Sequence, residues 1–300
     1  MTDQSIRLPA YGGQAVMEGV MMRGKQFIAM AVRAPSGEIV TFQDKLPVLY
    51  QSKWMKIPFI RGMISLWDSL GLGMQYLTKS ANVQSGDDEK LEGRDLFLTL
   101  GFAILLAIGV FFLLPALLAG WLDGLLHLGL WWGNVLEGLL RLVILVLYLT
   151  AIRRMPDIAR TFSYHGAEHK TINAFEAGVE LTAEQVAKQS TYHPRCGTSF
   201  ILTLVLISIL VFSILGPLTL VWRLVSRVLL LPIVAGISYE YIRWAANTMN
   251  KSALVRALIK PNLLLQSLTT RQPTIDMIEV AIKAFMTMYT AENPAESPTN

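Results

Sequence analysis

The sequence predicts a mostly α-helical polytopic membrane protein, with about four transmembrane helices and a small cytoplasmic β-meander near the N-terminus. The first observation is composition: 53% of the 300 residues are apolar and 16% are charged, against about 25% charged in soluble domains. The second is two uncharged runs, residues 96–122 and 196–222, each longer than the roughly 20 residues that cross a bilayer. The third is a set of short, partly alternating apolar stretches within residues 14–44, typical of strands.

Two weaker spans complete the predicted four. Residues 131–152 contain Glu137 and Arg141, an i,i+4 pair near one end of the run. Residues 224–246 carry Glu240 close to their end. The alternative, two helical hairpins buried in a soluble core, is disfavoured by the length of the uncharged runs.

The spans divide the chain into five predicted parts. These are a cytoplasmic β-rich part with an amphipathic helix (1–94), a first transmembrane hairpin (95–152), a cytoplasmic loop (153–198), a second transmembrane hairpin (199–247), and cytoplasmic C-terminal helices with a disordered tail (248–300). Strands are expected at 14–22, 26–34 and 38–44. The apolar face from Ile60 to Leu77 predicts a helix that lies on the membrane surface or packs on the meander.

Basic residues predict the orientation of the chain. The loop 120–129 contains no Lys or Arg, whereas residues 153–195 contain six. By the positive-inside bias, that segment and both termini are cytoplasmic. Arg223 and Arg227, in the other short loop, argue the opposite way. The first 14 residues hold no apolar run, so no cleavable signal peptide is expected.

Charge, cysteine content and short motifs indicate which partners and ligands the chain is expected to bind. The 26 basic and 22 acidic residues leave a net charge of +4, which does not indicate nucleic acid, so the lipid bilayer is the expected partner. The single cysteine excludes an internal disulfide. Gly19, Gly24 and Lys25 fit the frame of a phosphate-binding loop, but Gln26 stands where Ser or Thr would bind magnesium, so nucleotide binding is not expected. The sequence is compatible with a homo-oligomer.

The stretch from His165 to His169 matches H-x-x-E-H, the reversed zinc-hydrolase pattern. Residues 164–177 are expected to be helical. On a helix, residues i and i+4 share a face, so both imidazoles can reach one metal ion, zinc first among the divalent metals, at about 2.0–2.1 Å. Glu168 projects nearby, where a general base would take a proton from metal-activated water.

Two completions of this site stay open. His193 and Cys196 precede the third span and could join the first pair in a closed, structural zinc site. Alternatively, Glu240 could be the third ligand of a catalytic site, because a carboxylate inside a span needs a compensating partner. The alternatives without metal are hydrogen-bonded interfacial histidines, a small buried Cys196, and a Glu240 that pairs with Arg243.

Five segments in order, from about Gly12 to Tyr289, carry a resemblance: GGQAVMEGVMMRG, YHGAEHKTINAFEAG, HPRCGTSF, GISYE and LTTRQP. With them the chain resembles the DUF1385 (YqhQ-type) family of bacterial membrane proteins. The resemblance implies a multi-span protein of the bacterial inner (plasma) membrane and a predicted metal-dependent enzyme, with no settled reaction. It places emphasis on His165, Glu168, His169, His193, Cys196 and Glu240, which occupy these blocks.

Two functional hypotheses follow. The first is a metal-dependent, zinc-type membrane enzyme that hydrolyses a peptide or lipid-derived substrate at the cytoplasmic face, with His165 and His169 as metal ligands and Glu168 as the catalytic base. The second is a non-enzymatic membrane scaffold or assembly factor, whose structural metal site fixes its loop against the spans. Transport ranks last, because four spans leave little room for a pathway and no inverted repeat is evident.

Overall fold

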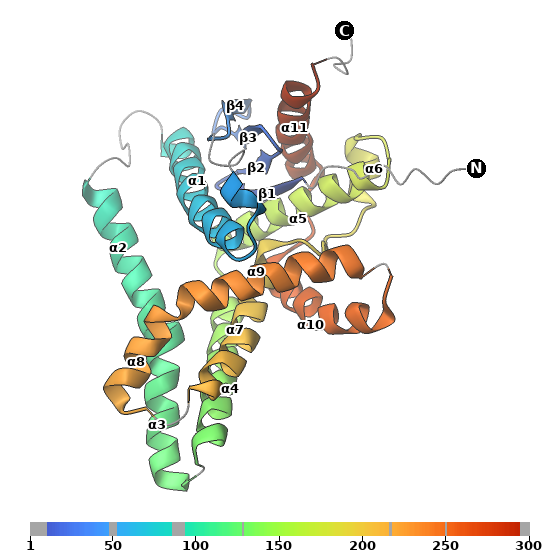
Figure 1. The fold of residues 1–300 in the computed structure, drawn as a ribbon. Coiled ribbons are helices and arrows are strands. Elements are labelled where there is room, and N and C mark those ends of the chain that lie inside the picture. Colours follow the sequence, from blue (N-terminus) through green and yellow to red (C-terminus); the bar gives the residue numbers. More distant parts are fainter. Residues whose placement is uncertain are drawn as a thin grey trace.

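The fold combines a head built on a small sheet with a stem of long apolar helices (Figure 1). The computed structural model describes residues 11–47, 53–85, 94–127, 129–215, 218–249 and 251–294. In chain order the elements are β1 (Gly12–Val16), β2 (Gly19–Arg23), β3 (Phe27–Arg33), β4 (Ile39–Lys45), the 3₁₀ turn η2 (Lys53–Lys56), α1 (Ile60–Ser85), α2 (Arg94–Ile108), the π-helical turn η3 (Gly109–Leu113), α3 (Leu114–Leu126), α4 (Leu130–Ile152), α5 (Pro156–Glu176), α6 (Ala183–Ala187), α7 (Gly197–Ile214), α8 (Leu220–Leu229), α9 (Leu231–Thr248), α10 (Ala253–Thr269) and α11 (Ile275–Glu292).

The head is a three-layer arrangement around the antiparallel sheet β1-β2-β3-β4. Side chains alternate between the two faces of a strand. Val20 and Met22 therefore pack with α5 and α11 on one face, while Met21 packs with Tyr76 of α1 on the other. The predicted antiparallel meander is confirmed, and the amphipathic helix packs on it through its second half.

The meander has one strand more than the sequence indicated. The expected strand 14–22 is a hairpin, in which β1 pairs with β2 from Gly12↔Arg23 to Val16↔Gly19. The turn runs through Met17 and Glu18, and Glu18 has φ 49°, an uncommon conformation for a residue with a side chain. The prediction of a single strand was wrong because both faces of the sheet are covered, so apolar residues stand close on both sides of a turn that contains only Met17 and the charged Glu18.

Three helices are long and apolar enough to cross a membrane: Leu98–Leu126, which runs from α2 through η3 into α3, Trp131–Ile152 and Gly197–Ile214. The first continues through the π-helical turn η3. With α8 they form the stem in the lower part of Figure 1, where α4 lies beside α7. Hydrophobic side chains that are well exposed on the stem include Phe102, Leu105 and Leu210.

The fourth expected span is broken. Residues 221–229 and 231–248 form two helices that meet at 45°, and they reach a span's length only if both count together. Pro232 stands at the start of α9, where its ring is compatible with a first turn but not with a continuous helix through α8. The part of the chain that the structure describes thus holds three apolar helices of spanning length, or four with this bent pair.

A buried ionic network joins the helices of the stem. Arg141 and Arg227 both donate to the carboxylate of Glu137, at 2.9 Å and at 2.6–2.8 Å. Arg141 also donates to the carbonyl oxygen of Phe111 in η3 at 2.9 Å. All three charged side chains are at most 3% exposed. Each charge has a partner, which an apolar surrounding requires.

Two expected segments are only partly described. The polar linker predicted after Ala81 is helical up to Ser85, the end of α1, and residues 86–93 lie outside the described residues. The expected C-terminal helix is present as α11, while residues 295–300 of the expected disordered tail also lie outside the described residues.

Candidate functional site

Helix α5 crosses the base of the head and carries the H-x-x-E-H residues near its middle. It begins with Pro156 at its first turn, a position where proline needs no amide hydrogen bond. Gly166 lies where the chain after α10 crosses the helix: a Cβ atom there would collide with the carbonyl oxygen of Arg271. The Arg271 amide donates to Phe162 at 3.0 Å. The missing side chain therefore allows the 269–273 segment to lie against α5, where Thr269 contacts His165.

The two histidines of α5 are oriented by backbone carbonyl groups. Nδ1 of His165 lies 2.9 Å from the carbonyl oxygen of Thr269, and Nδ1 of His169 lies 2.5 Å from that of Thr191. A carbonyl oxygen only accepts, so each Nδ1 carries the proton and each Nε2 presents a lone pair. The two rings lie 4.4 Å apart, centroid to centroid. Metal-binding histidines characteristically make this kind of second hydrogen bond.

Cys196 reaches the same place from the start of α7. It is the N-cap of that helix, and its sulfur accepts from the Thr198 amide at 3.4 Å. The Sγ atom lies 3.2 Å from Nε2 of His165. The preceding loop is held against α5 by Lys170, whose Nζ donates to the carbonyls of Ala187 and Gln189 at 2.7 and 2.5 Å.

His165, His169 and Cys196 converge closely enough to share an ion. One ligand atom from each lies within 4.8 Å of the other two. Nε2 of His169 is buried and has no hydrogen-bond partner among the described residues, and a buried lone pair without a partner is costly. Two imidazole nitrogens and one thiolate are the donor set typical of zinc. The residues present therefore fit a divalent metal ion on their chemistry.

His193 lies beside this cluster, not within it. Its ring centroid is 5.7 Å from that of His169, and it is not among the three side chains that converge. Its Nε2 is 3.5 Å from a carboxylate oxygen of Glu176 but makes no hydrogen bond among the described residues. Burial lowers the pKa of His193, while the charge of Glu168 acts in the opposite direction. We therefore treat it as a neutral imidazole without an ion-pair partner.

Glu168 is buried between α5 and the sheet, with 5% of its surface exposed. Burial raises the pKa of its carboxyl group, against the lowering effects of His165, of His193 and of a hydrogen bond from the Gly13 amide. Its Oε2 atom is buried and unpaired among the described residues. A Cβ atom on Gly13 would lie 3.0 Å from the Glu168 side chain, so the glycine allows this close approach.

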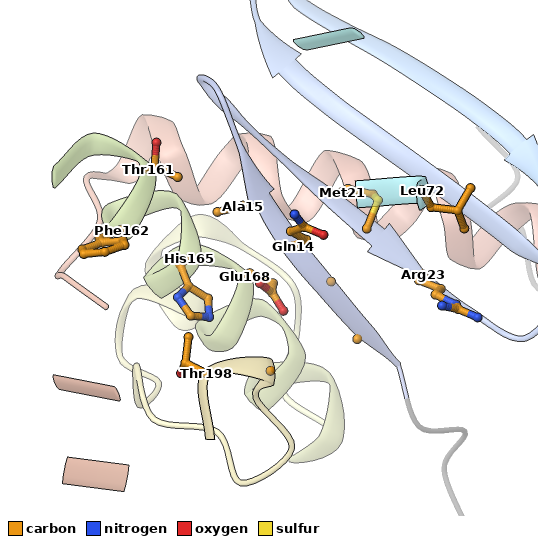
Figure 2. A pocket seen from close by; sticks show the side chains of 13 residues that line it. Gln14, Ala15, Met21, Arg23, Leu72, Thr161, Phe162, His165, Glu168 and Thr198 are labelled. Atoms are coloured by element: carbon orange, nitrogen blue, oxygen red, sulfur yellow. The ribbon is translucent and has the colours of Figure 1, made fainter. Parts of the chain in front are cut away.

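A cavity of about 470 Å³ opens beside these residues. Figure 2 shows His165 and Glu168 projecting into it from α5, opposite Gln14 and Ala15 of β1. The full lining consists of Gly12, Gly13, Gln14, Ala15, Met21, Arg23, Leu72, Thr161, Phe162, His165, Glu168, Gly197 and Thr198. The candidate ligand His165 and the Glu168 side chain thus border a space large enough for a small molecule or a chain segment.

Glu240 lies with a different partner. Its carboxylate accepts from Nε of Arg61 at 2.7 Å, with a second contact to Nη2 of the same side chain, and from the Phe59 amide at 3.2 Å. It is not among the three converging side chains. The expectation that Glu240 completes the site is therefore not met: Arg61, on α1, compensates its charge and joins α1 to α9.

Sequence reasoning did not find the groups that support the site. The carbonyl oxygens of Thr191 and Thr269, and the amide of Gly13, are backbone atoms with no signature in residue type. The nearest signal was the block LTTRQP, which contains Thr269 and Arg271 and stood out only through the family resemblance. The closeness of Gly13 to Glu168 spans more than 150 residues of chain, beyond any local periodicity.

Comparisons with known proteins agree with that resemblance. Residues 57–291 match the family model described as "Protein of unknown function (DUF1385)". A protein of Bacillus subtilis (strain 168) called "Uncharacterized protein YqhQ" is 36% identical over 306 residues, which cover 96% of this chain and 95% of that protein. No solved structure matches the chain.

Proposed function

Because the chain belongs to the DUF1385 family, which is described only as of unknown function, we propose a function from the site itself: a membrane-anchored, metal-dependent hydrolase. The observation that carries the proposal is the convergence of His165, His169 and Cys196 beside an unpaired, buried Glu168 at the wall of an accessible cavity. A ligand cluster, a proton-transfer group and a space for a substrate are the parts that such a reaction needs.

The membrane anchor is supported by the stem. Its helices expose large apolar side chains along lengths that suit a bilayer. The six basic residues of the 153–195 segment lie in the part of the chain that holds the site, which supports a cytoplasmic position for the site and for both termini in a bacterial inner membrane. The reaction would then take place close to the inner surface of the bilayer.

His165, His169 and Cys196 would hold the metal, with zinc favoured by the nitrogen and sulfur ligands. A bound divalent ion supplies Lewis-acid chemistry toward a carbonyl or phosphoryl group and toward water. The carbonyls of Thr269 and Thr191 fix the two imidazoles, so that both Nε2 atoms face the shared position. Three protein side chains would thus hold the ion, the number of protein ligands that is typical of catalytic zinc sites.

Glu168 would move the proton. A base must lose its proton at working pH yet hold one during the reaction, and a raised pKa brings a carboxyl group nearer to that balance. Burial raises the pKa of Glu168 in this direction. Its free Oε2 atom would take the proton of the attacking water and pass it to the leaving group. The Gly13 amide holds the carboxylate in place while this occurs.

Metal analysis and one substitution test the proposal. We expect about one zinc ion per purified chain, and loss of most of it in His169→Ala, with His127→Ala as the control because His127 is exposed and stands outside the cluster. Glu168→Gln should keep the metal and lose function in a complementation assay, whereas Glu180→Gln, an exposed change of the same kind, should keep both. A chain without bound metal, or a fully functional Glu168→Gln, rejects the hydrolase.

The second candidate is a scaffold with a structural metal site. It is favoured by one observation: Cys196 is at once a cluster member and the N-cap of α7, so a bound ion would fix the loop to the stem. Under this hypothesis Cys196→Ala lowers thermal stability together with metal content, and Glu168→Gln changes nothing. The response of function to Glu168→Gln therefore separates the two.

A further inference from the structure

The strand β1 forms a wall of the cavity and is also an edge of the sheet. Four consecutive residues, Gly12 to Ala15, line the space that contains His165 and Glu168. Within the described residues β1 pairs with β2 alone. Its second backbone edge therefore has no strand partner there, and such an edge is a template for an added strand.

The direction of the free polar groups follows from the pairing. Val16 and Gly19 flank the two-residue turn and so form a hydrogen-bonded pair, which places Gly13↔Met22, three pairs further on, among the pairs whose N–H and C=O groups point away from the partner strand. In an antiparallel ladder, residues alternate between pairs that exchange both hydrogen bonds and pairs that exchange none. Ala15, two residues further on, therefore also directs its N–H and C=O away from β2. The Gly13 carbonyl, the Ala15 N–H and the Ala15 carbonyl thus form a row of free hydrogen-bonding groups, two acceptors with a donor between them, that is about 7 Å long.

The geometry of the cavity allows a second backbone to approach this row. No atom lies within 4 Å of the place where a Cβ atom of Gly12 would stand, so there is free space at the start of β1. Figure 2 shows the strand running past Glu168, and both Gln14 and Ala15 line the cavity. An occupant aligned with β1 would thus extend toward His165 and Glu168.

We propose that the substrate of this site is an extended polypeptide that adds to the edge of β1 as a further strand, which brings one of its peptide bonds next to Glu168. This rests on the proposed hydrolase function. Only a polypeptide offers N–H and C=O groups at the spacing of the β1 edge. A lipid-derived substrate has no such repeat, so the edge favours a peptide.

The reaction would be hydrolysis of a peptide bond. The C–N bond breaks, the hydroxyl of a water molecule joins the carbonyl carbon, and the remaining proton of that water goes to the leaving nitrogen. Glu168 carries this proton on Oε2 between the two. The products are a carboxylic acid and an amine, and no oxidant or further reactant is needed.

Peptide binding to the full-length protein in nanodiscs tests the inference. The probe is a pool of fluorescein-labelled random decapeptides, compared by anisotropy with the same pool N-methylated at every internal amide, which removes its hydrogen-bond donors. We expect the methylated pool to bind about fivefold more weakly or worse, because the two hydrogen bonds to the Gly13 and Ala15 carbonyls are lost. Ala15→Pro removes the outward N–H, a change that edge strands tolerate, and should weaken the unmethylated pool similarly. Ala15→Ser keeps the N–H and should bind like the wild type.

A second pair of variants covers the case in which Ala15→Pro does not fold. Gly12→Phe fills the open end of the cavity and should weaken binding, whereas Gly71→Phe adds the same ring at an exposed position of α1 with open space around it and should not. Equal binding of the two pools, or binding of a fluorescent short-chain phosphatidylglycerol that neither pool displaces, overturns the inference. Metal content is measured on the same samples. If the protein holds no metal but binds the unmethylated pool more tightly than the methylated pool, only the hydrolase proposal is rejected. If the protein holds metal but binds both pools equally, only the proposal of strand addition is rejected.

Discussion

Gly166→Ala tests whether the crossing of the 269–273 segment over α5 is what orients the site. The added methyl group would collide with the carbonyl oxygen of Arg271, a backbone atom that cannot rotate away as a side chain can. The Arg271 amide is tied to Phe162 at 3.0 Å, and the Thr269 carbonyl to His165 at 2.9 Å. The segment must therefore move away from the helix and take its hydrogen bonds with it.

The expected magnitude is the balance of two opposing effects. In an open helix, Gly→Ala adds about 1 kcal/mol of stability. Overpacking of a tight contact costs about 1–3 kcal/mol, and a lost hydrogen bond costs about 1 kcal/mol more. We expect Gly166→Ala to lower the free energy of unfolding by about 1–3 kcal/mol. Because the Thr269 carbonyl supports a candidate ligand, metal affinity should fall by roughly 10–100-fold.

The assay is thermal unfolding in detergent together with competition for zinc by a chromophoric chelator. Gly71→Ala is the matched control: Gly71 is also in a helix, is exposed, and has no atom within 4 Å of its missing side chain. It should be as stable as the wild type or more so, with unchanged metal affinity. A Gly166→Ala protein that behaves like Gly71→Ala would refute the reasoning.

Three further outcomes are expected. Glu137→Gln leaves two buried arginines of the stem without a counter-charge and should lower the free energy of unfolding by about 3–5 kcal/mol. Folded yield and melting temperature in detergent measure this effect, and an unchanged yield would contradict the importance of the network. Glu240→Gln and Arg61→Ala remove the same contact between α9 and α1, whose side chains are 20% and 17% exposed. A double-mutant cycle should therefore give a coupling of about 1 kcal/mol, and metal content should not change. A hydrogen bond from Arg160 lowers the pKa of Glu18. The pair therefore stabilises the β1-β2 turn when the pH is above the usual carboxyl pKa, and this stabilisation is lost as the pH falls through the lowered pKa. The stability difference between wild type and Glu18→Gln should shrink on acidification, and a constant difference from pH 7 to pH 3 would contradict the prediction.

The sequence predicted those features that repeat locally. Two uncharged runs and one of the two weaker spans predicted the three apolar helices that are present at spanning length. The four-residue interval between His165 and His169 predicted a shared helical face, and their rings lie 4.4 Å apart. Alternation predicted the antiparallel meander. It missed the turn at Glu18, because helices cover both faces of the sheet and apolar residues resume directly after the turn, at Val20.

The sequence by itself determined which side chains carry chemistry and which segments avoid water, because residue type and spacing along one helix or strand decide both. Only the tertiary structure decided which distant groups meet. It joined Cys196 to the two histidines, left His193 beside them, paired Glu240 with Arg61, and placed the Gly13 amide on Glu168. The physical reason is that a charge, a lone pair or a strand edge requires some partner but does not specify which one, and the choice falls to whichever group the packing of the whole chain brings within reach.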